Sequence, residues 1–264
     1  MAAHDRRGFT LVEILISATI MAIVLLAIYL VQDASQLTAV RGQTQTNIQQ
    51  NARVAVEEMA REIRMAGYGV PNVNCPGTLP VIGAANRTSI TFRADLRTTT
   101  TALTAAAAIG ATGLTVDSST GLANLDTLYL TDGPNCEVAT VSGAPGATTI
   151  TLAAGTAKAY AIGSRVYRPK DVTFNVTGGQ ITRSEVNPGA AASPSALADK
   201  VPAQNVFIYY DAGNTDITGD AARMASPDAN VRRIRITLNT TDTPPGPNDP
   251  RNYTVQSDVK LRNF

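Results

Sequence analysis

The sequence has no tryptophan and a single histidine among its 264 residues. That histidine is His4, so the chain beyond the first few residues lacks the imidazole that Ser-His-Asp triads and HExxH zinc sites require. It also contains no G-x-S-x-G turn and no P-loop. We therefore expect a protein that is not an enzyme and that needs no cofactor.

Proline is absent from the first 70 residues, and charge is absent from residues 14–31. Residues 9–31 would form a helix about 34 Å long, enough to cross a bilayer core of about 30 Å. Beyond residue 31 a stripe of apolar and small residues continues at helical spacing, which predicts an amphipathic half from 32 to 67 whose last helical residue is Ala66 and whose cap is Gly67. The stripe comprises Leu37, Val40, Thr44, Ile48, Ala52, Ala55, Met59, Ile63 and Ala66.

A short basic leader precedes the apolar segment, and one carboxylate, that of Glu13, lies near the start of the segment. A lone acid is costly in lipid, so Glu13 requires a partner. The run from Gly8 through Phe9 to Glu13 (GFTLVE) resembles the class III signal of type IV prepilins. The resemblance implies that a prepilin peptidase and methyltransferase removes residues 1–8, cutting between Gly8 and Phe9, and methylates the new amine of Phe9.

The anchor is expected to stay in the mature protein, because the candidate cleavage site precedes the apolar segment, whereas a secretory signal is cut after it. Arg6 and Arg7 on one side, against Asp33 on the other, place the leader in the cytoplasm. We expect a single-pass protein of the bacterial inner membrane with a periplasmic head. After assembly it would lie in a filament at the cell surface.

The resemblance also implies a role for Glu13. In a filament its carboxylate would pair with the N-terminal amine of a neighbouring subunit, which would neutralise two charges in an apolar environment. The alternative is a glutamate at the headgroup level that extends its carboxylate to water.

Residues 68–264 change in composition and show short alternating runs that predict half-buried β-strands. Examples are Val172, Phe174 and Val176 in one strand and Val206, Ile208 and Tyr210 in another. The expected fold class is α+β, with a long N-terminal helix packed on a β-rich head. Residues 98–168 look like a β-module inserted in that head. They contain two near-copies, Gly110–Val116 and Gly146–Leu152.

Cys75 and Cys136 are the only cysteines, and both follow the membrane segment. We predict a disulfide between them rather than two free thiols, because thiols outside the cytoplasm tend to oxidise. A zinc site is not expected, since too few cysteine and histidine ligands are present.

An acidic loop contains Asp211, Asn214, Asp216 and Asp220, oxygen donors of the kind that calcium binds. The order of an EF-hand and its terminal glutamate are absent, and acidic hairpin loops without an ion have the same composition. We expect no metal here and retain calcium as the weaker alternative.

The end of the helix (residues 49–67) and the final strand (residues 257–263) resemble minor pilins of the PilW type and J-type pseudopilins. The expected function is that of a minor pilin, with a type II secretion pseudopilin as the first alternative. A membrane-anchored adhesive or ligand-binding head is the alternative of a different class. Expected partners are the prepilin peptidase, major and minor pilins, the inner-membrane assembly platform and the membrane itself.

No specific nucleic acid is predicted as a partner. Loss of the leader would remove Arg6, Arg7 and Asp5 and leave equal numbers of basic and acidic residues. A positive field, on which non-specific DNA binding depends, is therefore missing overall. Arg232, Arg233 and Arg235 form a local basic patch on one strand, but strand edges often carry such charges as protection against pairing with other strands.

Overall fold

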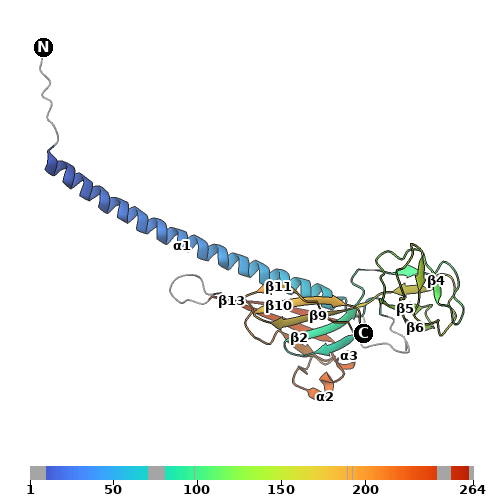
Figure 1. Cartoon of the computed structure of the whole chain (residues 1–264). Helices are drawn as coiled ribbons and strands as arrows, with labels where there is room; N and C mark the ends of the chain where they lie inside the picture. Colours follow the sequence, from blue (N-terminus) through green and yellow to red (C-terminus); the bar gives the residue numbers. More distant parts are fainter. Residues whose placement is uncertain are drawn as a thin grey trace, which may run out of the picture. The chain divides into compact units, whose positions relative to one another are not determined.

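The computed structural model describes residues 10–70, 81–97, 99–188, 190–191, 193–242 and 251–261. One long helix, α1 (Leu11–Arg64), is followed by β-sheets and two short helices, α2 (Ala221–Met224) and α3 (Pro227–Asn230), as Figure 1 shows. The predicted α+β fold class is confirmed. The chain divides into two compact units, residues 1–47 with 242–251 and residues 48–241 with 252–264.

Helix α1 ends two residues earlier than the sequence predicted. Met65 and Ala66 still donate backbone hydrogen bonds to carbonyls three residues back, which is the tightening usual in a last helical turn. Gly67 has a φ of 81°, the left-handed conformation expected of a residue that stops a helix. Its N–H donates to the carbonyl oxygen of Arg93 at 2.9 Å, so the chain passes directly from the helix to a sheet.

The last turns of α1 pack into the main core of the second unit. The amphipathic stripe is confirmed there, because its members from residue 52 onward are buried. They pack with residues of two sheets, including Phe92 and Phe174, whose ring centroids lie 6.1 Å apart. The buried helical residues are Ala52, Ala55, Val56, Met59, Ala60, Glu62, Ile63 and Ala66.

The larger sheet of this core has five antiparallel strands in the order β1-β2-β9-β10-β11. Strands β2 and β9 are distant in sequence because the segment 95–169 lies between them, yet they pair along six residues. The strands are β1 (Ile82–Ala85), β2 (Ser89–Ala94), β9 (Lys170–Thr177), β10 (Gln180–Val186) and β11 (Ser195–Asp199).

The second sheet has the order β12-β13-β14, comprising β12 (Phe207–Tyr210), β13 (Arg233–Asp242) and β14 (Arg251–Lys260). The predicted inward face of β12 was wrong by one residue: Phe207 and Tyr209 are fully buried, whereas Ile208 and Tyr210 are only partly so. Two aromatic rings fill more core volume than the alternative of one ring and an isoleucine. Burial is also permitted because the Tyr209 hydroxyl donates to the carbonyl oxygen of Asn86 at 2.9 Å.

The strands between residues 101 and 167 form two further sheets with a separate core. The near-copies noticed in the sequence pair with each other, since Leu114 lies opposite Ile150 in an antiparallel ladder. One sheet has the order β3-β8-β5-β6 and the other joins β4 to β7. The strands are β3 (Thr101–Ala102), β4 (Gly113–Thr115), β5 (Thr127–Thr131), β6 (Cys136–Thr140), β7 (Thr149–Thr151) and β8 (Arg165–Tyr167).

Candidate functional site

The start of α1 is fixed by Thr10 and Glu13. Thr10 precedes the first helical residue, and its Oγ1 accepts a hydrogen bond from the backbone N–H of Glu13 at 3.3 Å. A threonine followed three residues later by a glutamate is the sequence pattern of a helix-capping box, a local signal for the helix start that lies within the GFTLVE run. The carboxylate of Glu13 also lies in the first turn, where the helix dipole favours negative charge.

Every residue of α1 from 11 to 36 is exposed. Among the described residues, α1 is the one helix whose length and apolar composition would allow it to cross a membrane. Large apolar side chains such as Ile23 and Leu26 are more than half exposed. Such a surface needs lipid or other helices around it, because each fully buried side chain of this size gains about 1.5–3 kcal/mol. Gly8 and Phe9, the predicted cleavage site, lie outside the described residues.

Cys136 opens β6 and is 2% exposed. No free cysteine occurs in the described part of the chain. Its predicted partner, Cys75, lies outside that part, so the pairing of Cys75 with Cys136 stays a prediction.

The side chains of the acidic loop between β12 and α2 accept hydrogen bonds from the loop itself and from α2. Asp211 accepts hydrogen bonds from the Thr215 N–H at 2.9 Å and from Arg223 at 2.7 Å. Asp220 caps α2 by accepting from the N–H groups of Ala222 and Arg223. The bonds to Asp211, first the one from Thr215, lower the pKa of that carboxyl. Within the described ranges no group of three or more His, Cys, Asp or Glu side chains has the arrangement of a metal site.

The other two residues of that loop have local roles. Asp216 accepts from the N–H of Thr218 at 2.9 Å, and hydrogen bonds from Thr218 lower its pKa. Asn214 has a φ of 65°, a left-handed conformation that asparagine tolerates better than most residues. The loop is thus closed by local hydrogen bonds.

Tertiary contacts offset part of the charge of the basic patch at the start of β13. Arg233 and Arg235 both bind Asp258 of β14, at 2.6 and 3.1 Å, and the guanidinium of Arg233 stacks 3.6 Å from the ring centroid of Tyr210. Hydrogen bonds from Arg235 lower the pKa of Asp258. Arg232 instead donates to the carbonyl oxygen of Asp228. Asp258 thus offsets one of the three positive charges.

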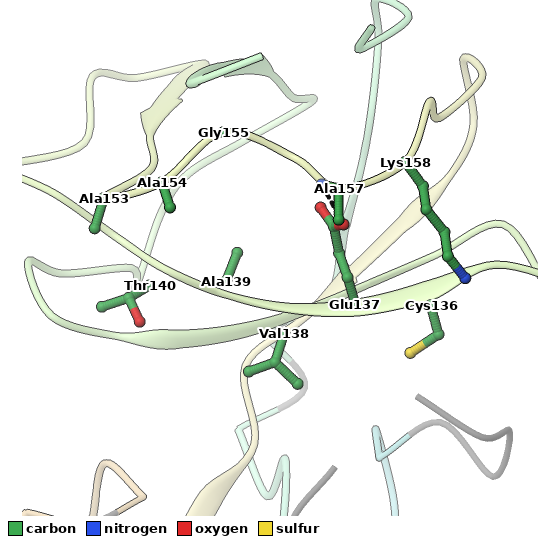
Figure 2. Close-up of a pocket in the computed structure, with 10 residues that line it drawn as sticks. All are labelled: Cys136, Glu137, Val138, Ala139, Thr140, Ala153, Ala154, Gly155, Ala157 and Lys158. Carbon is green, nitrogen blue, oxygen red and sulfur yellow. Dashed lines mark hydrogen bonds between the residues drawn. The ribbon is translucent and has the colours of Figure 1, made fainter. Parts of the chain in front are cut away.

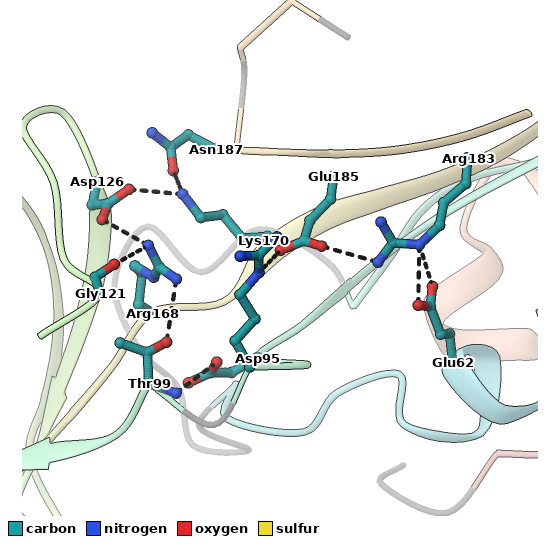
Figure 3. A network of polar contacts seen from close by, with 11 residues as sticks. Glu62, Asp95, Thr99, Gly121, Asp126, Arg168, Lys170, Arg183, Glu185 and Asn187 are labelled. Carbon is teal, nitrogen blue, oxygen red and sulfur yellow. Dashed lines mark hydrogen bonds and ion pairs between the residues drawn. The ribbon is translucent and has the colours of Figure 1, made fainter. Parts of the chain in front are cut away.

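A network of ion pairs joins the end of α1 to β10, as Figure 3 shows. Arg183 Nε donates to both oxygens of Glu62, at 2.8 and 3.0 Å, and its terminal nitrogen donates to Glu185 at 2.9 Å. Burial raises the pKa of Glu62, and the bonds from Arg183 offset only part of that effect. Charge spacing along the sequence does not reveal this network, because Glu62 and Arg183 are 121 positions apart.

A second network surrounds Asp126, which is 1% exposed (Figure 3). Its carboxylate accepts from Lys170 Nζ at 2.7 Å, from the Ala123 N–H at 2.7 Å and from Arg168 at 3.2 Å. Burial alone would raise the pKa of Asp126, but these hydrogen bonds outweigh it and the pKa is lowered. This buried carboxylate lies where the chain returns from the segment 99–168 to β9. No pattern in the sequence had indicated it.

A cavity of about 290 Å³ lies between β6 and residues 153–158 (Figure 2). Glu137 reaches across it, and its Oε2 accepts from the Ala157 N–H at 2.7 Å. The side chain of Lys158 also lines the cavity, and the other walls are mainly alanine and glycine. Glu137 is 8% exposed, so its carboxyl group is largely shielded from water. Nothing in its sequence neighbourhood had singled out this glutamate.

Residues 4–29 match the family model of the prokaryotic N-terminal methylation motif. The match covers the run from Gly8 to Glu13 and most of the apolar segment that follows. Comparisons with curated proteins and with solved structures give no significant match. The assignment of function therefore depends on the N-terminal segment.

Proposed function

We propose that this type IV pilin-like protein is a minor pilin, a structural subunit that takes part in starting and assembling a type IV pilus at or near its tip. The class III signal at its N-terminus implies processing by a prepilin peptidase and assembly with other pilins. It is the signal of a structural pilin rather than of an enzyme family. The signal and the apolar helix also fit membrane anchoring followed by assembly.

The observation that carries the proposal is the methylation motif placed at the start of a 54-residue helix. The first half of that helix is exposed and apolar all round, whereas its last turns are buried in the head. The exposed half of such a helix is surrounded by two different apolar environments, one before and one after assembly. Lipid surrounds the exposed half before assembly, and the same half of neighbouring subunits surrounds it in the filament.

Glu13 supplies the electrostatic part of assembly in this proposal. Cleavage after Gly8 gives Phe9 a cationic amine, and both this amine and the Glu13 carboxylate are costly in an apolar environment. Pairing the carboxylate of one subunit with the amine of the next neutralises both. The capping contact between Thr10 and Glu13 uses the backbone N–H of Glu13, so replacement of its side chain leaves that contact available.

The substitution Glu13→Val tests this role. We expect a chain that inserts and is processed normally but is absent from filaments sheared off cells, measured by immunoblot of the sheared and membrane fractions. Ser17→Ala is the matched control, since Ser17 lies one turn further along and donates only to the Glu13 carbonyl oxygen. Undiminished incorporation of Glu13→Val would refute the pairing role.

A place at or near the tip is proposed because the head is large. It comprises two sheets around the end of α1 and two further sheets in the segment 99–168, which we propose to be a module inserted in the head. Bulky heads limit close helical packing of many identical copies. Quantitative mass spectrometry of sheared filaments should find far fewer copies of this chain than of the major pilin. A ratio near one would contradict the minor role.

A secretion pseudopilin would have the same N-terminal signal. Deleting the gene and measuring both surface pili and secreted proteins separates the two, because loss of pili alone is expected here. An adhesive role of the head would instead leave assembled pili in place but reduce attachment of cells to surfaces.

A further inference from the structure

Three polar side chains meet where the chain enters β9. Lys170 is the first residue of β9, and Asn187 directly follows β10. The register pairs Asp171 with Val186, so Lys170 and Asn187 lie opposite each other at the open end of the hairpin. Lys170 Nζ contacts the side-chain carbonyl oxygen of Asn187 and donates to Asp126 Oδ1 at 2.7 Å, as Figure 3 shows.

The amide of Asn187 is held in one orientation. Its Nδ2 donates to the carbonyl oxygen of Leu125 at 3.2 Å, so its carbonyl faces Lys170. Leu125 has a φ of 67°, a conformation rare for a residue with a branched side chain. A residue is held in this conformation only when its surroundings determine it. The backbone of Leu125 thus presents its carbonyl to the amide and places Asp126 beside Lys170.

We propose that Lys170 and Asn187 join in an intramolecular isopeptide bond, with Asp126 as the group that transfers the proton. A primary amine lies against an amide carbonyl, and a buried carboxylate is hydrogen-bonded to the amine. These are the nucleophile, the electrophile and the base that amide exchange needs. Fixed positions in one folded chain replace a bimolecular encounter, which removes much of the entropic barrier to such a reaction.

The reaction is balanced without another reactant. Asp126 accepts a proton from the Lys170 ammonium, and the neutral Nζ attacks Cγ of Asn187 to form the Nζ–Cγ bond. The Cγ–Nδ2 bond then breaks, and Nδ2 leaves as ammonia after receiving the proton from Asp126. The second proton of Nζ is released as the new amide forms, and the departing ammonia takes it up as ammonium. No group is oxidised or reduced.

The charges around Lys170 predict how the rate depends on pH. Asp126 and Arg168 are the charged groups beside it, and hydrogen bonds, first the one from Lys170 itself, lower the pKa of Asp126. The next residue, Asp171, is paired with Arg93. Only an amine without its extra proton can attack a carbonyl carbon, so bond formation should become faster as pH rises.

Competing loss of ammonia from Asn187 is limited by its neighbour. Asparagine side chains usually lose ammonia by cyclising onto the next backbone N–H, but the next residue is Pro188, which has none. At this position Lys170 is the nucleophile that the fold supplies.

The test is the mass of the full-length chain, purified in detergent with a reducing agent present. We expect a species lighter by one ammonia than the processed sequence, and a fraction of it that grows during incubation at alkaline pH. A tryptic digest should contain one branched peptide that joins the segments around Lys170 and Asn187. Fragmentation of that peptide locates the linkage.

Lys170→Arg is the decisive variant, because arginine keeps a cation beside Asp126 but removes the primary amine. It should retain the full mass, whereas Lys158→Arg, a control in the same head, should lose ammonia as the native chain does. The proposal is overturned if the native chain keeps its full mass after alkaline incubation. It is also overturned if Lys170→Arg loses ammonia to the same extent as the native chain.

Discussion

The docking of α1 on the head gives the most quantitative prediction. Ile63 lies in the last turn of the helix, is 0% exposed and packs in the core shared with the two sheets. Ile63→Ala removes about 1.5–3 kcal/mol of burial and leaves a cavity that the sheets on either side cannot fully close. We expect a loss of about 3 kcal/mol in the free energy of unfolding. For a chain of this size that corresponds to a melting midpoint lower by about 6–12 °C.

The assay is thermal unfolding of the purified full-length chain in detergent, followed by near-ultraviolet circular dichroism of its tyrosines. Val54→Ala is the matched control, because Val54 lies on the same helix but is 60% exposed. Its replacement should change stability by less than about 0.5 kcal/mol, since surface substitutions usually do. The docking argument fails if Ile63→Ala melts with the native chain, or if Val54→Ala is destabilised as much as Ile63→Ala.

Three further predictions use the same preparation. Tyr209→Phe removes a buried hydroxyl that donates to a backbone carbonyl, so stability should fall by about 1–2 kcal/mol, and an unchanged midpoint would contradict the hydrogen bond. The pKa of Asp126 is lower in the folded than in the unfolded state. Its carboxylate therefore stabilises the fold at a pH above its pKa in the unfolded state, and this contribution is lost as pH falls through its pKa in the folded state. Native protein should therefore lose stability in acid more steeply than Asp126→Asn, and equal slopes would refute this. A non-reducing digest should contain one peptide pair joined through Cys75 and Cys136, and recovery of both free thiols would exclude the bridge; reduction should cost up to about 4 kcal/mol.

The helix was predictable because its signals are local. Absence of proline, a long uncharged segment and a stripe at helical spacing all act within a few turns, and the predicted end lay within two residues of Arg64. Strand positions were also predictable from alternation. The face of β12 was not, because its strand has apolar residues on both faces and the choice of Phe207 and Tyr209 depends on what fills the core.

Charged residues show the opposite pattern. Arg233 and Arg235 suggested a basic patch in the sequence, but Asp258 on the neighbouring strand binds both and offsets part of their charge. Asp126 and Lys170 gave no signal at all, since they are 44 positions apart and nothing local requires their contact. Ion pairs of this kind depend on which segments the topology brings together.

The sequence by itself determined that this chain carries a prepilin signal, an apolar helix and a β-rich head. Each of these depends on neighbouring residues and on their affinity for lipid or water. Only the tertiary structure decided that Glu62 meets Arg183 at the base of the helix and that Lys170 lies between Asp126 and Asn187. The reason is that burial and pairing of charge are properties of segments distant in sequence, which are brought together only when β2, β9 and β10 form one sheet.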